Sequence, residues 1–92
     1  MKFYFSWDPE KAASNRRKHG VSFEEVTTVF ADPLARIEWD MDHSESEERE
    51  LILGQAASGR LFVVSFVQRG STIRVISARL ATRRERHVYQ EA

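Results

Sequence analysis

Four segments of the chain after Pro33 have the patterns of β-strands, which are either an alternation of apolar and polar residues or a continuous apolar run. The turn-forming pairs Ser58-Gly59 and Arg69-Gly70 separate the last three segments, so we expect an antiparallel meander. The stretch Leu61 to Val67 is almost wholly apolar, which predicts a central strand that is buried on both faces. The four predicted strands are Leu34–Asp40, Glu50–Ala57, Arg60–Gln68 and Ser71–Arg79.

The first third of the chain is organised by helix signals. An aromatic-rich segment, Phe3–Trp7, predicts a short strand. Asp8 follows as an N-cap with proline at the first helical position, and Gly20 is suited to the left-handed residue that ends a helix. Together they predict a helix over Pro9–His19.

A second helix is predicted directly after the first. Ser22 and Glu25 have the spacing of a capping box, and Val21 and Val26 have the spacing of a hydrophobic staple. The helix is expected to end at Asp32, because the residue before a proline avoids the helical conformation.

The last helix has a capping box of its own. Thr82 and Glu85 predict a helix from Arg83 to Gln90. The complete order is then β-α-α-β-β-β-β-α, which indicates a single domain over residues 1–92 of the α+β class, with a mainly antiparallel twisted sheet packed against helices.

Composition excludes several classes of protein. The 92 residues include no cysteine, which rules out disulfides, thiolate metal sites and cysteine nucleophiles. No run of eighteen apolar residues and no signal peptide is present, so we expect a cytoplasmic protein that does not enter a membrane.

The formal net charge is zero, but the charges are segregated along the chain. Residues 1–23 carry five basic and two acidic side chains, residues 24–50 carry two basic and ten acidic, and residues 51–92 carry seven basic and two acidic. Segregated charge can steer a polyanion to one face of a neutral protein, because electrostatic fields are local on the scale of the Debye length. The alternative is that the blocks neutralise one another after folding.

The C-terminal stretch "IRVISARLATRRERHVYQEA" holds five arginines, and two of them lie in a predicted strand. Arg74 and Arg79 point to opposite faces if the strand alternates strictly, whereas a bulge near Ala78 brings them closer. A guanidinium in a strand needs either an acidic partner or an anion, because burying it alone is costly. Glu85 or the acidic block is the structural candidate, and a phosphate is the functional one.

RNA is an anion whose cleavage needs no metal. A base removes the 2′-hydroxyl proton, the oxygen attacks phosphorus, and an acid protonates the departing 5′-oxygen. Arginine forks stabilise the charge on the phosphoryl oxygens. The candidate clamps are Arg60, Arg74, Arg79 and Arg83, and the candidate proton carriers are His19, His87, Glu85 and Tyr89.

Two further polar clusters leave alternatives open. Lys18 and His19 close the first helix, where the helix dipole favours positive charge, or else they contact phosphate. Asp40, Asp42 and His43 form a D-x-D-H group of potential Mg²⁺ or Mn²⁺ ligands. Their spacing matches no defined metal site, so we expect neither a metal nor another cofactor.

Three segments together resemble one known family in order and spacing. They contain the elements W-D-x-x-K, K-H-G-V-x-F and I-S-A-R-x-A-x-x-x-E-R, and the likeness runs from about Phe5 to Tyr89. The chain resembles the BrnT toxins of type II toxin–antitoxin systems. The resemblance implies a small RelE-like fold and a ribonuclease that blocks translation. It also implies an antitoxin, BrnA, whose ribbon-helix-helix part binds operator DNA, so that the toxin reaches DNA only through the antitoxin.

The residues and the resemblance together give a set of expected roles. The leading hypothesis is a metal-independent endoribonuclease, and the alternative is a non-catalytic module that binds RNA or a protein. The expected catalytic residues are Arg74, Arg79, Glu85, Tyr89 and His19, and the expected RNA-binding residues are Lys18, Arg60, Ser77, Arg83 and Arg86.

Overall fold

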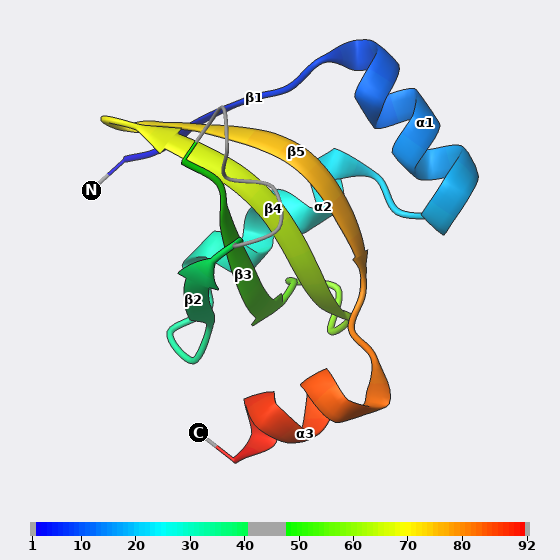
Figure 1. Ribbon diagram of the computed structural model, residues 1–92, viewed down its shortest axis with the longest axis vertical. Coiled ribbons are helices and arrows are strands. Elements are labelled where there is room, and N and C mark those ends of the chain that lie inside the picture. Colours follow the sequence, from blue (N-terminus) through cyan, green and yellow to red (C-terminus); the bar gives the residue numbers. More distant parts are fainter. Residues whose placement is uncertain (1, 41–47, 92) are drawn as a thin grey trace.

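The computed structural model describes residues 2–40 and 48–91 (Figure 1). Within these residues, three helices, a 3₁₀ segment and five strands follow one another in the predicted order. The elements are β1 (Tyr4–Ser6), α1 (Pro9–His19), α2 (Phe23–Val26), η1 (Thr27–Ala31), β2 (Arg36–Trp39), β3 (Glu50–Gln55), β4 (Leu61–Arg69), β5 (Thr72–Leu80) and α3 (Arg83–Gln90). The predicted α+β fold is confirmed.

The five strands form one sheet in the order β1-β5-β4-β3-β2. The pairs from β2 to β5 are antiparallel, and β1 runs parallel to β5. The predicted meander of the last three strands is therefore confirmed. Its middle strand, β4, is buried from Leu61 to Val67, as its continuous apolar run indicated.

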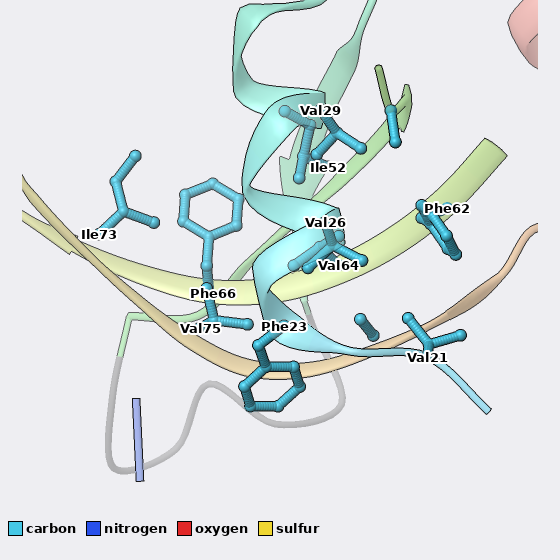
Figure 2. Close-up of a cluster of buried hydrophobic side chains, with 12 residues drawn as sticks. Val21, Phe23, Val26, Val29, Ile52, Phe62, Val64, Phe66, Ile73 and Val75 are labelled. Carbon is cyan, nitrogen blue, oxygen red and sulfur yellow. The ribbon is translucent and has the colours of Figure 1, made fainter. Parts of the chain in front are cut away.

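The hydrophobic core lies between one face of this sheet and the segment formed by α2 and η1, which runs behind the strands in Figure 1. The buried cluster drawn in Figure 2 contains Phe23, Val26 and Val29 of this segment together with Val64 and Phe66 of β4. The 3₁₀ segment η1 approaches β3 closely at a glycine, since a Cβ on Gly54 would lie 3.3 Å from the Cβ of Val29. Among the described residues, the opposite face of the sheet is left open between α1, which contacts β5, and α3, which contacts β3.

The first helix begins and ends as its sequence signals predict. The Asp8 side chain accepts a hydrogen bond of 2.9 Å from the backbone N–H of Glu10. At the other end, Gly20 adopts φ 69°, and its N–H donates to the Arg16 carbonyl. A left-handed glycine of this kind stops the helix at His19.

The second predicted helix is α-helical only over its first turn, so the expectation of one helix to Asp32 was wrong in its second half. The physical reason is the run of β-branched residues Val26-Thr27-Thr28-Val29, which disfavours the α-helix. The hydroxyls of Thr27 and Thr28 donate to carbonyls three residues earlier, at 2.9 Å each, and the segment continues as a tighter 3₁₀ helix.

Candidate functional site

A cleft of about 510 Å³ lies between α1 and this face of the sheet, opposite the core. Its lining comes from α1, from the ends of β2 and β3, and from the middle of β4 and β5. Cationic and hydroxyl side chains predominate among its polar groups, with one carboxylate. The lining residues are Lys11, His19, Asp40, Arg49, Leu51, Val63, Ser65, Ile76, Ser77, Ala78 and Arg79.

A β-bulge brings the arginines of β5 to the same face. Ser65 of β4 lies opposite Ser77, but the next residue, Phe66, lies opposite Val75, so Ile76 is the extra residue on β5. Val67 and Val63 lie opposite Arg74 and Arg79. Because directly opposed residues share a face, Arg74, Ser77 and Arg79 all project from the open face. Strict alternation along β5 would have separated the two arginines.

The helix α1 is held against β5 by a buried asparagine. Asn15 is 6% exposed, and its amide donates to the carbonyls of Val21 and Ala78 at 3.1 and 2.9 Å, while its oxygen accepts from the Ala78 N–H at 3.0 Å. The Asn15 side chain therefore pairs with the backbone of β5 at Ala78, beyond residues 72–74, which pair with β1. Lys11 and His19 lie four residues either side of Asn15, on the same row of the helix, and both line the cleft.

Arg79 at the cleft is held by the last helix. Its Nη1 and Nη2 lie 2.8 and 2.9 Å from the two oxygens of Glu85. Glu85 also completes the predicted capping box of α3, accepting from the Thr82 N–H at 2.8 Å. The hydrogen bonds from Arg79 lower the pKa of Glu85 to about 2, and the same pair raises the pKa of Arg79. Glu85 is therefore an ionised carboxylate that orients an arginine.

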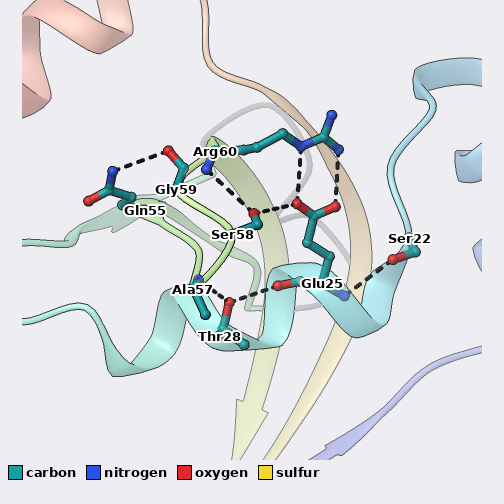
Figure 3. Close-up of polar contacts among 8 residues, drawn as sticks. All are labelled: Ser22, Glu25, Thr28, Gln55, Ala57, Ser58, Gly59 and Arg60. Atoms are coloured by element: carbon teal, nitrogen blue, oxygen red, sulfur yellow. Dashed lines mark hydrogen bonds and ion pairs between the residues drawn. The ribbon is translucent and has the colours of Figure 1, made fainter.

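Arg60 is engaged away from the cleft, in a network around Glu25 that Figure 3 shows. Its Nε and Nη2 each lie 3.0 Å from a Glu25 oxygen, and its guanidinium stacks 5.0 Å from the ring centre of Phe62. The Ser58 hydroxyl donates to Glu25 at 2.6 Å. Because this carboxylate is used by Arg60 and Ser58, the capping box predicted for the second helix is half formed, with only the bond from the Glu25 N–H to Ser22 present at 3.2 Å.

Tyr89 also has a partner outside the cleft. Its hydroxyl donates to Asp32 at 2.7 Å, and this hydrogen bond raises the pKa of Tyr89. Burial raises the pKa of Asp32, but the hydrogen bonds from Gln55, Tyr89 and Leu34 outweigh it and lower the value overall. The contact ties α3 to the loop before β2.

The other predicted residues lie around the cleft or away from it. Of the ten, His19, Ser77 and Arg79 line it together. Arg74 shares its face but lies nearer the β4–β5 turn and is exposed. Lys18, Arg83 and Arg86 are exposed on their helices. Of the D-x-D-H group, Asp40 is buried at the cleft, whereas Asp42 and His43 lie outside the described residues.

Three polar residues of the cleft were not among the predicted site residues, namely Lys11, Arg49 and Ser65, and Asp40 was considered only as a metal ligand. Two of them carried a signal in the sequence. Lys11 closes the W-D-x-x-K element, and Ser65 is the polar residue inside the apolar stretch Leu61–Val67. Arg49 and Asp40 come together through the backbone of β2 and β3, with the Asp40 N–H donating to the Arg49 carbonyl at 3.0 Å, which spacing alone does not reveal.

The fold and the cleft define a class of protein: a small α+β protein whose open sheet face gathers cationic and hydroxyl side chains suited to a phosphodiester. A family model described as "Ribonuclease toxin, BrnT, of type II toxin-antitoxin system" matches residues 7–85. The chain belongs to this BrnT family of ribonuclease toxins. As a type II toxin it has a cognate antitoxin partner.

A solved structure agrees with this assignment. The crystal structure of the Brucella abortus ribonuclease toxin BrnT is similar to the chain with a TM-score of 0.64 and 26% sequence identity, covering 90% of this chain and 99% of that one. No curated protein matches the chain. Among the helices of residues 2–40 and 48–91, none is long and apolar enough to cross a membrane.

Proposed function

We propose that the chain cleaves RNA at the cleft between α1 and β5, by attack of the ribose 2′-oxygen on the adjacent phosphorus and without a metal ion. The observation that carries the proposal is the position of His19, Ser77 and Arg79, which come from a helix end and a strand and line one cleft. These side chains supply a proton carrier, a hydroxyl donor and a fixed cation, which are the groups that this chemistry requires.

In the proposed reaction, His19 accepts the proton of the 2′-hydroxyl, because an imidazole can take up and release a proton near neutral pH. The 2′-oxygen forms a bond to phosphorus, and the bond from phosphorus to the 5′-oxygen breaks. Water supplies the proton that the departing 5′-oxygen takes up. The products are a 2′,3′-cyclic phosphate and a 5′-hydroxyl end.

Arg79 is the proposed clamp on the phosphoryl oxygens. Nη1 and Nη2 of Arg79 bind Glu85. A guanidinium has a second pair of parallel N–H groups, on Nε and the adjacent Nη, and this pair is left for a phosphate. Arg74 projects from the same face of the sheet and is suited to bind the next phosphate of the RNA chain. Glu85 acts through Arg79 as a positioning residue, because a carboxylate with a pKa of about 2 holds no proton to donate at neutral pH.

The biological role follows from family membership. Cutting messenger RNA in the cytoplasm would stop translation and arrest growth. We propose that the cognate antitoxin is BrnA-like, with a ribbon-helix-helix part through which the complex binds operator DNA. A short adjacent reading frame encoding such a protein would support this pairing, and an unrelated neighbour would argue against it.

The test is cleavage of single-stranded RNA by the protein freed from its antitoxin, with a chelator present. We expect cleavage in chelator and product ends that carry a 2′,3′-cyclic phosphate. Arg84→Ala is the control for a change of charge outside the site and should cut RNA as wild type does, since Arg84 is exposed on α3 and does not line the cleft. RNA left intact with and without divalent metal contradicts the enzymatic proposal, and cleavage that requires the metal contradicts the mechanism.

A further inference from the structure

The floor of the cleft differs in chemistry from its rim. Lys11 and His19 are exposed and Arg79 is half-buried, so these cations form the rim, whereas the middle of the sheet forms the floor. Asp40, which is 8% exposed, lines the cleft at the end of β2. The apolar side chains of the floor are Leu51, Val63 and Ile76. A charged rim around an apolar floor is suited to a ligand that has an anionic part and a flat, largely apolar part.

One polar side chain lies within this apolar floor. Ser65 is on the central strand and is 6% exposed, and its register places it on the open face opposite Ser77. No group in residues 2–40 or 48–91 forms a hydrogen bond with its buried hydroxyl oxygen. A buried hydroxyl without a partner is unfavourable, so its place at a binding cleft indicates a partner supplied by a ligand. Rotation about one side-chain torsion redirects this hydroxyl without moving the strand.

We propose that the floor of the cleft binds one nucleobase of the RNA and that the Ser65 hydroxyl hydrogen-bonds to the polar edge of that base. The inference rests on the proposed function, because the RNA brings the base to the cleft. A phosphate is a poor occupant of the floor, since the exposed cations Lys11 and His19 lie at the rim and Ser65 lies beside the apolar Leu51 of β3. A nucleobase can place its apolar faces against the apolar side chains of the floor and the polar atoms of its edge against the Ser65 hydroxyl.

The spacing along β5 supports a nucleotide in this orientation. Ser77, opposite Ser65, and Arg79 are two residues apart on the same face, which corresponds to about 7 Å. That is the scale of the separation between a base and the phosphate of its own nucleotide. The volume of about 510 Å³ also falls within the range of ligand sites.

The proposed base site favours an unpaired base over a base in a duplex. A base inside a duplex is stacked and paired, and its removal costs energy that an unpaired base does not require. A single hydroxyl also distinguishes bases by the donor or acceptor that they present to it. A base that leaves the hydroxyl without a partner is disfavoured.

The experiment compares wild type, Ser65→Ala and the matched control Ser14→Ala, an exposed serine of α1. Each protein cuts a pool of single-stranded RNA with randomised positions, and the product ends are sequenced. We expect wild type and Ser14→Ala to prefer one base at one position beside the cut, and Ser65→Ala to lose about tenfold of that preference. An unchanged preference in Ser65→Ala overturns the inference, and so does an equal loss of cleavage on all sequences.

A binding measurement separates this inference from the proposed function. Oligonucleotides with 2′-deoxyribose throughout lack the attacking hydroxyl, and their affinities for the same three proteins are measured by fluorescence anisotropy. If wild type prefers one base in binding and Ser65→Ala removes that preference, the base site is supported. If wild type also cuts no RNA, only the proposed function is refuted. Cleavage by wild type together with equal affinities for all four bases refutes the base site alone.

Discussion

Arg79 and Glu85 are joined by two parallel hydrogen bonds of 2.8 and 2.9 Å between a guanidinium on the cleft and a carboxylate in the first turn of α3. The same carboxylate accepts a hydrogen bond from the Thr82 N–H. One acidic side chain therefore caps the last helix and orients the arginine that we assign to the phosphate. We therefore expect changes at this pair to affect both stability and activity.

The first prediction concerns the acid stability of the protein. The pKa of Glu85 is lowered from 4.5 to about 2 in the folded state, so between these values the unfolded chain binds more protons than the folded one. The stabilisation from Glu85 is thus complete above about pH 4.5 and is lost as the pH falls toward 2. We expect the Tm of wild type to decrease more steeply over this interval than the Tm of Glu85→Gln. Parallel curves would contradict this account of the pair.

The second prediction concerns the buried asparagine of α1. Asn15→Ala leaves the N–H and carbonyl of Ala78 and the carbonyl of Val21 without their partner. We expect a loss of about 2–4 kcal/mol in the free energy of unfolding, measured by urea denaturation. Ser14→Ala, on the exposed side of the same helix, should change it by less than about 0.5 kcal/mol. Equal effects of the two substitutions would mean that Asn15 does not anchor the helix.

The sequence predicted the elements well because most of their signals are local. Asp8, Gly20 and Thr82 cap helices through contacts within a few residues, and the helices they border begin and end as expected. The continuous apolar run of β4 likewise predicted its central position. The exception in the second helix is also local, since adjacent β-branched residues changed the type of helix.

The site was predicted less completely, because its geometry depends on contacts between distant segments. The bulge at Ile76, which brings Arg74 and Arg79 to one face, is set by pairing with β4. The partner of Arg60 is 35 residues earlier, at Glu25, and neither residue suggests the other by spacing. A sequence pattern gives the residue types that bind a phosphate, but tertiary pairing decides which of them are available.

The third prediction concerns the stability of the Ser65 variant. Its hydroxyl has no hydrogen-bond partner within the described parts of the chain, so Ser65→Ala removes an unfavourable buried group. We expect the Tm to stay the same or to rise, measured by thermal denaturation. Val64→Ala on the same strand removes core packing and should cost about 2 kcal/mol. A clear loss of stability in Ser65→Ala would show that the hydroxyl is satisfied in the free protein.

The fourth prediction separates a structural role of Tyr89 from a catalytic one. Tyr89→Phe removes the 2.7 Å hydrogen bond to Asp32, while Asp32 keeps its bonds from the N–H groups of Gln55 and Leu34. We expect a loss of about 1 kcal/mol in the free energy of unfolding and an unchanged rate of RNA cleavage. A large fall in the cleavage rate of a folded Tyr89→Phe protein would show that the Tyr89 hydroxyl takes part in catalysis.

The most direct test of the central claim compares two arginines that both bind a glutamate with two hydrogen bonds. Arg79 lines the cleft, and Arg60 is held by Glu25 away from it. The measurement is the single-turnover rate of RNA cleavage by Arg79→Ala and Arg60→Ala, at a temperature where both variants are folded. We predict a loss of at least about 100-fold for Arg79→Ala and a rate close to wild type for Arg60→Ala. Equal losses in the two variants, or wild-type cleavage by Arg79→Ala, would contradict the assignment of the cleft as the site of RNA cleavage.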